Sequence, residues 1–133
     1  MVLVDANVLI DLFTDDPEWA EWSSQALADA AMTGEVLINP IIYAEVSIAF
    51  NQAAVLNTVL EKINISKVDL PYPAAFLAGK AFLEYRQRGG LKRSPLPDFY
   101  IGAHALHDRL KLLTRDPTRY QTYFPSVELI SPG

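Results

Sequence analysis

The chain has 133 residues, of which 50% are hydrophobic and 20% are charged, and this globular composition excludes a disordered chain. It contains no cysteine, which excludes disulfides, thiolate zinc sites and cysteine nucleophiles. The net charge of -5 argues against a protein that coats nucleic acid by bulk charge, but an enzyme that recruits a divalent cation remains possible. The length predicts one domain over residues 1–133.

The sequence carries no targeting or membrane signal. The apolar run at Val2–Val4 has no basic residue ahead of it and is interrupted at once by Asp5, so it does not look like a signal peptide. No apolar stretch is long enough to span a bilayer. Because the lack of cysteine also fits a reducing compartment, we expect a cytoplasmic protein without membrane association.

Short apolar runs alternate with helical patterns along the chain, which predicts βα units and a mainly parallel sheet. Asp16 and Pro17 are typical of an N-cap and a first helical position. The predicted strands cover 2–4, 36–38, a segment that includes Val68, 110–113 and 127–130; the predicted helices cover 7–13, 17–32, 40–51, a segment ending near 63, 73–88, 98–107 and 117–124, with a loop at 91–97. The expected fold class is α/β, a three-layer α/β/α sandwich around a sheet of four or five strands.

Two acidic residues follow predicted strands directly. Asp5 comes after the first strand, and Asp116 comes shortly after the strand at 110–113. Ligand sites in open α/β sheets form outside the carboxyl ends of the strands, so the two carboxylates are candidates for one shared site.

Two more acids lie on predicted apolar helix faces. Glu45 has isoleucines and alanine three and four residues away, and Asp98 begins a helix with Ile101 and Gly102 one turn on. A carboxylate on such a face is costly to bury without a partner, a proton or a metal.

Four converging carboxylates would repel one another and raise their pKa values. A hard divalent cation keeps such a group ionised, and oxygen ligands suit Mg²⁺ or Mn²⁺. The cluster Asp5, Glu45, Asp98 and Asp116 therefore points to metal-assisted hydrolysis.

Each acid also has an ordinary structural interpretation. Asp5 and Asp116 could be helix caps, Asp98 a first-turn acid favoured by the helix dipole, and Glu45 a residue at the edge of an apolar stripe. Taken singly, these interpretations are as good as the functional one. Together they do not explain why two acids follow strands and two lie on apolar helix faces.

The same residues carry a family resemblance. The segment from Val2 to Asp11 resembles the opening motif of PIN-domain nucleases, in which an apolar strand ends in an acid, here Asp5, and a polar residue, here Asn7, stands two positions on. The surroundings of Glu45, the run Pro97–Ala103 and the run Leu113–Pro117 resemble the second, third and fourth motifs. The length resembles that of VapC-type toxins of toxin–antitoxin pairs.

The resemblance implies endonucleolytic cleavage of RNA by metal-activated water. It implies Asp5 and Asp98 as direct metal ligands, with Glu45 and Asp116 acting directly or through water, and Thr114 and Asn7 orienting ligands. It also implies a homodimer held inactive by a partner antitoxin. The resemblance supports a nuclease more strongly than a toxin, because the fold also serves in RNA processing.

A basic segment precedes Asp98, and we expect it to guide RNA towards the metal. A solvated helix end is the alternative. Arg115 could contact phosphate or pair with a neighbouring acid, Arg119 is a weaker candidate of the same kind, and Asp11 is more typical of a helix-proximal acid than of a ligand. The segment contributes Arg86, Arg88, Lys92 and Arg93.

Histidine and zinc chemistry are disfavoured. His104 lies about 240° round a helix from Asp98, so a structural or surface role is expected for it and for His107.

Two other functions stay open. A haloacid-dehalogenase-like phosphatase also places an acid after its first strand, but that family needs a second Asp where Asn7 stands. A catalytically silent PIN-like module that binds protein or RNA is the other, although all four acids are present.

Overall fold

The computed structural model describes residues 1–93 and 96–133. Five short strands form one sheet in the order β3-β2-β1-β4-β5, and every neighbouring pair is parallel. The strands are β1 Val2–Val4, β2 Val36–Ile38, β3 Ile65–Lys67, β4 Lys111–Leu113 and β5 Leu129–Ile130. The expected parallel α/β/α sandwich is confirmed, with five strands.

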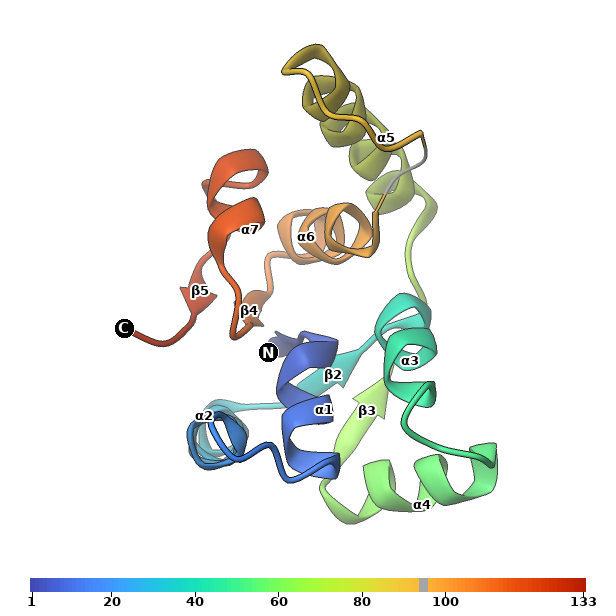
Figure 1. The fold of residues 1–133 in the computed structure, drawn as a ribbon, viewed down its shortest axis with the longest axis vertical. Coiled ribbons are helices and arrows are strands. Elements are labelled where there is room, and N and C mark those ends of the chain that lie inside the picture. The colour runs from blue at the N-terminus through green and yellow to red at the C-terminus, as the bar shows by residue number, and fades with distance from the viewer. Residues whose placement is uncertain (94–95) are drawn as a thin grey trace.

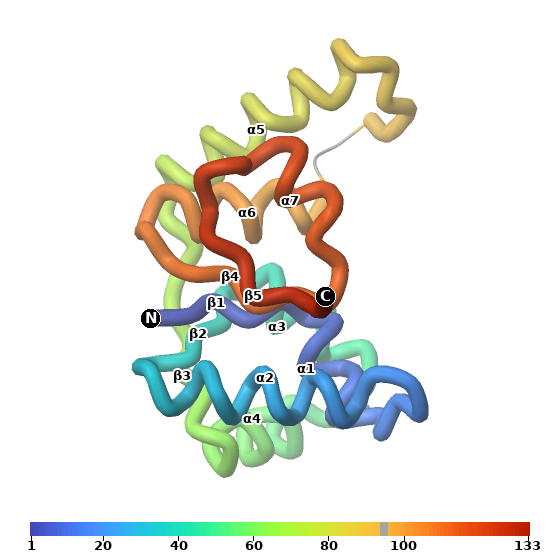
Figure 2. The backbone as a smooth tube through the Cα atoms, turned by 90° about the vertical axis from the view of Figure 1, so that its left-hand side faces the viewer, coloured from blue at the N-terminus to red at the C-terminus, as the bar shows by residue number. Residues whose placement is uncertain are grey.

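Seven helices in the described residues cover the sheet: α1 Ala6–Phe13, α2 Ala20–Thr33, α3 Pro40–Ser47, α4 Ala53–Lys62, α5 Tyr72–Gln87, α6 Pro97–Asp108 and α7 Thr118–Tyr123. Figure 2 shows α1, α2 and α4 on one side of the sheet and α5, α6 and α7 on the other. Right-handed crossovers explain this division, because the chain moves outward from β1 in one direction as far as β3 and then returns to add β4 and β5 on the other flank.

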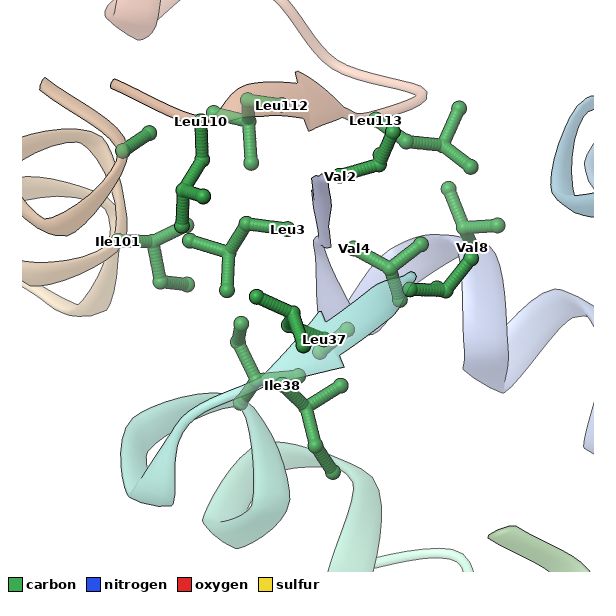
Figure 3. Close-up of a cluster of buried hydrophobic side chains, with 14 of the residues drawn as sticks. Val2, Leu3, Val4, Val8, Leu37, Ile38, Ile101, Leu110, Leu112 and Leu113 are labelled. Carbon is green, nitrogen blue, oxygen red and sulfur yellow. The ribbon is translucent and has the colours of Figure 1, made fainter. Parts of the chain in front are cut away.

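The core is built on β1, which is buried along its whole length. Successive side chains of a strand point to opposite faces. In Figure 3, Leu3 lies on the side of Ile101 from α6, and Val4 lies on the side of Val8 from α1. All four side chains are fully buried. Each contributes roughly 1.5–3 kcal/mol of transfer free energy, and their packing holds the end of β1 in place.

A glycine sets the distance between α6 and α7. A Cβ atom on Gly102 would overlap the ring of Phe124, so only glycine fits this position without a shift. The close approach brings the segment after β4 against α6, the helix that carries Asp98 (Figure 1).

Several predicted boundaries were wrong by a few residues. Asp16 caps a turn instead of a helix: its Oδ1 accepts hydrogen bonds from the backbone N–H groups of Glu18 and Trp19, and α2 begins only at Ala20. The helix predicted at 40–51 ends at Ser47. Val68 lies just beyond β3, although its N–H still bonds to the Ile38 carbonyl.

The remaining differences are small. The last strand covers 129–130 instead of 127–130, and residues 94 and 95 of the predicted loop at 91–97 lie outside the described part of the chain. No helix of the described residues combines the length and apolar character needed to cross a membrane.

Candidate active site

Asp5 leaves the carboxyl end of β1 and is 5% exposed. Its backbone N–H donates to the Leu113 carbonyl, which extends the pairing of β1 with β4 to the site. Its Oδ1 accepts from the N–H of Ala6 at 2.8 Å, so Asp5 caps α1 as the structural interpretation predicted. The other oxygen, Oδ2, faces the site and is held by side chains from distant parts of the chain.

The side chains of Thr114 and Asn7 contact Asp5. The Thr114 hydroxyl is fully buried and donates to Asp5 Oδ2 at 2.9 Å. Asn7 Nδ2 lies 3.5 Å from the same oxygen and 3.4 Å from the Thr114 hydroxyl. The Thr114 hydroxyl also accepts the backbone N–H of Asp116 at 3.1 Å, and Asn7 Oδ1 accepts that of Arg115. The ends of β1 and β4 are therefore locked together through polar side chains.

Asp98 enters from the first turn of α6. Pro97 occupies an early helical position where no backbone N–H is needed, so the helix begins beside the sheet. Asp98 Oδ1 lies 3.4 Å from the hydroxyl of Tyr120, and its Oδ2 lies 3.5 Å from Nη1 of Arg119. The carboxylate remains 36% exposed and borders a cavity of about 350 Å³ that Asp116 also lines.

Glu45 lies on α3, whose start is fixed by Asn39: its side chain accepts the N–H of Ile42, and Pro40 follows it. Glu45 Oε1 is buried without a hydrogen-bond partner among the described residues. A buried, unpartnered carboxylate oxygen is costly, so this atom favours a cation or a proton beside it.

Burial and nearby negative charge raise the pKa values of Asp5, Glu45 and Asp98. Burial raises the pKa of Asp5 to about 6, against hydrogen bonds from Thr114 and Tyr120 that lower it, and the charge of Asp98 adds to the increase. Burial and then the charges of Asp5 and Asp98 raise the pKa of Glu45 to about 7. Burial also raises the pKa of Asp98, with Arg119 opposing and Asp116 reinforcing the change. Asp5, Glu45 and Asp98 therefore form one electrostatic group with Asp116 at its edge.

The donors in this group fit a hard divalent cation. All are carboxylate oxygens, which Mg²⁺ and Mn²⁺ prefer, and the unpartnered Glu45 Oε1 needs positive charge or a proton. Within the described residues, no three acidic or histidine side chains lie close enough together to form a complete metal cage as they stand. The hydroxyl of Tyr120 donates to Asp5 and lies 3.4 Å from Asp98, between two of the candidate ligands.

Tyr120 is the site residue that the sequence did not reveal. It is fully buried on α7, and its hydroxyl donates to Asp5 Oδ2 at 2.9 Å. Burial, followed by the charges of Asp5 and Asp98, raises its pKa well above the usual value of 10, so it remains a donor. Its spacing of four from Phe124 indicates a core-facing aromatic residue, but nothing in that pattern indicates where the hydroxyl points.

The basic residues have different surroundings. Arg115 pairs with the buried Asp11, with Nε 2.8 Å from Oδ2 and Nη2 3.1 Å from Oδ1. Pairing with a neighbouring acid is one of the two roles expected of Arg115. Arg86 donates to the carbonyl of Lys92 at 2.7 Å, and Arg88 pairs with Glu84. These two arginines stabilise the end of α5, and none of the three has a described contact with the acid cluster.

Lys92 and Arg93 are exposed. Arg119, considered the weaker candidate, is the cation that contacts Asp98.

His104 has the structural role expected of it. It is fully buried, with Nδ1 2.9 Å from Asn39 Nδ2 and Nε2 3.0 Å from Asp108 Oδ2. Because Asn39 uses its Oδ1 for the cap of α3, its amide nitrogen donates to His104. His104 thus connects α3, which carries Glu45, with α6, which carries Asp98.

The fold of the chain is similar to that of chains in solved toxin–antitoxin complexes. The chain is similar over its whole length to a chain of VapBC2 from Rickettsia felis bound to a promoter DNA fragment, with a TM-score of 0.76, 18% identity and 100% of both chains covered. It is similar to a chain of a toxin–antitoxin complex from Klebsiella pneumoniae, with a TM-score of 0.70, 27% identity and coverage of 100% and 98%. The chain is also similar to a chain of VapBC-1 from nontypeable Haemophilus influenzae, with a TM-score of 0.72, 16% identity and 98% of both chains covered.

No curated protein matches the sequence. The family model described as PIN domain matches residues 2–125, which is nearly the whole chain. The chain therefore belongs to the PIN domain family.

Proposed function

We propose that this protein is a divalent-metal-dependent endoribonuclease. The observation that carries the proposal is the group of Asp5, Glu45 and Asp98, brought together from three elements at the carboxyl end of the sheet, with Glu45 Oε1 buried and unpartnered. Membership of the PIN domain family gives independent support for a nuclease and leaves a haloacid-dehalogenase-like phosphatase without support. The four intact acids favour an active enzyme over a silent binding module.

In this proposal Asp5, Asp98, Glu45 and Asp116 hold Mg²⁺ or Mn²⁺. The ion, when bound, supplies a water of lowered pKa and positive charge at the reacting phosphate. Thr114 and Asn7 fix the orientation of Asp5 through the hydrogen bonds at its Oδ2.

We further propose that exposed cations guide the RNA strand. Lys92 and Arg93 are the exposed members of this segment at the loop, Arg86 donates to the Lys92 carbonyl, and Arg88 pairs with Glu84 on α5. Arg115, which binds Asp11, keeps part of its side chain exposed and remains a candidate for a phosphate contact beside Asp116.

The test is cleavage of a mixture of structured RNAs by the purified protein with Mg²⁺ or Mn²⁺. We expect cutting that is lost with EDTA and in the Asp5→Asn variant, and retained in the control Asp29→Asn, which changes an exposed acid on α2. Cutting that survives both EDTA and Asp5→Asn would sink the proposal. No cutting with either metal would favour the silent binding module.

The biological role proposed is that of a VapC-type toxin in the cytoplasm, which acts as a homodimer and is inhibited by a cognate antitoxin protein. The support is the likeness to chains from toxin–antitoxin complexes. Exposed apolar side chains on α5, among them Phe76 and Leu83, provide surface for such protein contacts.

Expression in a bacterial host should arrest growth for the wild type and not for Asp5→Asn, and sedimentation should give a dimer. Normal growth with active nuclease would instead favour RNA processing.

A further inference from the structure

A cavity of about 350 Å³ borders the acid cluster. Asp98 and Asp116 form one part of its lining, and Tyr85 from α5 and Tyr123 from α7 form another. Its size is at the lower end of the range of small-molecule sites. It therefore suits a single nucleotide better than a base-paired helix.

Arg119 gives the cavity a flat cationic surface. Its guanidinium carbon lies 5.8 Å from the centre of the Tyr85 ring and 5.7 Å from that of Phe99, and Nη1 lies 3.5 Å from Asp98 Oδ2. The side chain is still 37% exposed. A guanidinium held over aromatic rings by a carboxylate keeps its plane fixed, and unpaired bases stack on such planes and on tyrosine rings.

The aromatic wall is supported from behind. The Tyr123 ring packs edge-on against Phe99 at 5.4 Å between centres, and Tyr85 packs against the same ring at 5.6 Å. The guanidinium of Arg88 lies 5.3 Å from the Tyr123 ring. Because the buried Phe99 anchors both tyrosines, a base that stacks here meets a surface that is already ordered, which reduces the entropy cost of binding.

We infer that this cavity binds one unpaired nucleotide of the RNA, the one next to the scissile phosphate, with its base stacked against Arg119 and Tyr123. The inference rests on the proposed ribonuclease function, since the acids that border the cavity are the proposed metal ligands. A base inside a duplex is already stacked and would have to be extruded to enter. Arg119 and Tyr123 therefore determine the base preference at the position that flanks the scissile phosphate.

The test separates binding from cutting. Arg119→Gln and Tyr123→Leu are introduced into the otherwise wild-type protein. The affinity for a 12-nucleotide unpaired RNA that contains the fluorescent base 2-aminopurine is measured with Ca²⁺ in place of Mg²⁺, so that a cation occupies the acid cluster without supporting cutting. We expect each substitution to weaken binding about tenfold and to abolish the quenching caused by stacking. The matched controls Arg109→Gln and Tyr72→Leu, both at exposed positions outside the cavity, should bind like the parent.

Unchanged affinity and quenching in both variants would overturn the inference, provided that thermal unfolding shows them folded. In the otherwise wild-type enzyme, the same two substitutions should lower kcat/KM about tenfold on the unpaired RNA, and annealing it to its complement should protect it. If the wild type cuts no RNA but binding still depends on Arg119 and Tyr123, the ribonuclease proposal fails and the nucleotide site stands.

Discussion

The hydroxyl of Tyr120 is the atom that connects Asp5 with Asp98. It donates to Asp5 Oδ2 at 2.9 Å and lies 3.4 Å from Asp98 Oδ1, and Tyr120 itself is fully buried. One hydroxyl has a single proton to donate, so its bond to Asp5 orients that carboxylate while Asp98 stays nearby. We assign Tyr120 a positioning role.

Tyr120→Phe should therefore lower kcat/KM about tenfold and weaken Mn²⁺ binding, while changing the melting temperature by only a few degrees, because the ring still fills its place. Calorimetric Mn²⁺ titration and RNA cleavage measure the two effects. Tyr43→Phe is a matched control, since it removes a hydroxyl bond of the same length to Asn57 on α4. Equal metal affinity in wild type and Tyr120→Phe would argue for a purely structural tyrosine.

The unpartnered Glu45 makes the metal-free protein less stable at high pH. The pKa of Glu45 is near 4.5 in the unfolded chain and is raised to about 7 in the folded protein. The protonated carboxyl therefore stabilises the fold fully at a pH below 4.5, and this stabilisation is lost as the pH rises through 7. Glu45→Gln should thus stabilise the metal-free protein by about 1 kcal/mol at pH 8, a value reduced by the partial exposure of the side chain. Urea unfolding at pH 8 and pH 5 measures it, and a stabilisation that is equal at both pH values would contradict this explanation.

At the residue scale, the sequence predicts the positions of those side chains that follow a strand end or belong to a motif. Asp5, Asn7 and Thr114, which the resemblance to PIN-domain motifs grouped together, lie within hydrogen-bonding reach of one another. Tyr120 was missed because periodicity reports which face is buried but not where a hydroxyl points. Arg115 had two expected partners, and only the fold shows that Asp11 lies opposite it.

At the element scale, the position of α3 relative to α6 sets the distance between Glu45 and Asp98. The connection is the hydrogen-bonded chain from Asn39 to His104 to Asp108. His104 accepts from Asn39 and must be neutral to do so. Burial lowers its pKa, against the opposing effect of Asp108. Protonation would break the bond to Asn39 and loosen the two helices.

The stabilisation of the fold by neutral His104 is fully present at a pH above the unfolded pKa of histidine, about 6.5. It is lost as the pH falls, because the unfolded chain then binds a proton that the folded protein resists. The difference in unfolding free energy between wild type and His104→Gln should therefore shrink from pH 7.5 to pH 5.5, by up to about 1.4 kcal/mol per pH unit. Comparison with this variant cancels the opposite pH dependence of Asp5 and Glu45. A pH-independent difference would rule out a neutral His104 as the connection.

The order and type of the elements could be predicted because short apolar runs and proline-marked helix starts are local signals. The Asn39–Pro40 start of α3 is an example. The Asp16–Pro17 signal looked the same but led to a turn, since two N–H groups ahead of α2 already satisfy Asp16. The early end of α3 and the shortened β5 were not predictable, because tertiary packing decides where an element stops.

At the scale of the whole molecule, a chain with a net charge of -5 must attract RNA through local features. The acid cluster is the least favourable place for a phosphate until a cation neutralises it. The cations near it are Arg119 at Asp98 and Arg115 at Asp11, each partly exposed. Metal binding and RNA binding should consequently be coupled at this end of the sheet.

The cleavage rate should rise as the pH increases from about 5.5 to 8. The acids must lose their protons to hold a cation, and the pKa values of Asp5 and Glu45 are raised to about 6 and about 7. A higher Mn²⁺ concentration should shift the rising limb to lower pH, because the metal competes with protons for the same oxygens. Initial rates at several Mn²⁺ concentrations test this, and a limb that stays fixed would mean that another group controls it.

The most direct test of the metal-dependent site is a Mn²⁺ titration followed by electron paramagnetic resonance, with RNA cleavage measured in the same samples. We predict that bound Mn²⁺ and cleavage rate rise together in the wild type, and that Asp5→Asn and Asp98→Asn lose both while remaining folded. Tight Mn²⁺ binding that persists in both variants, or cleavage that proceeds without bound metal, would contradict the assignment of the carboxylate cluster as the metal-dependent active site.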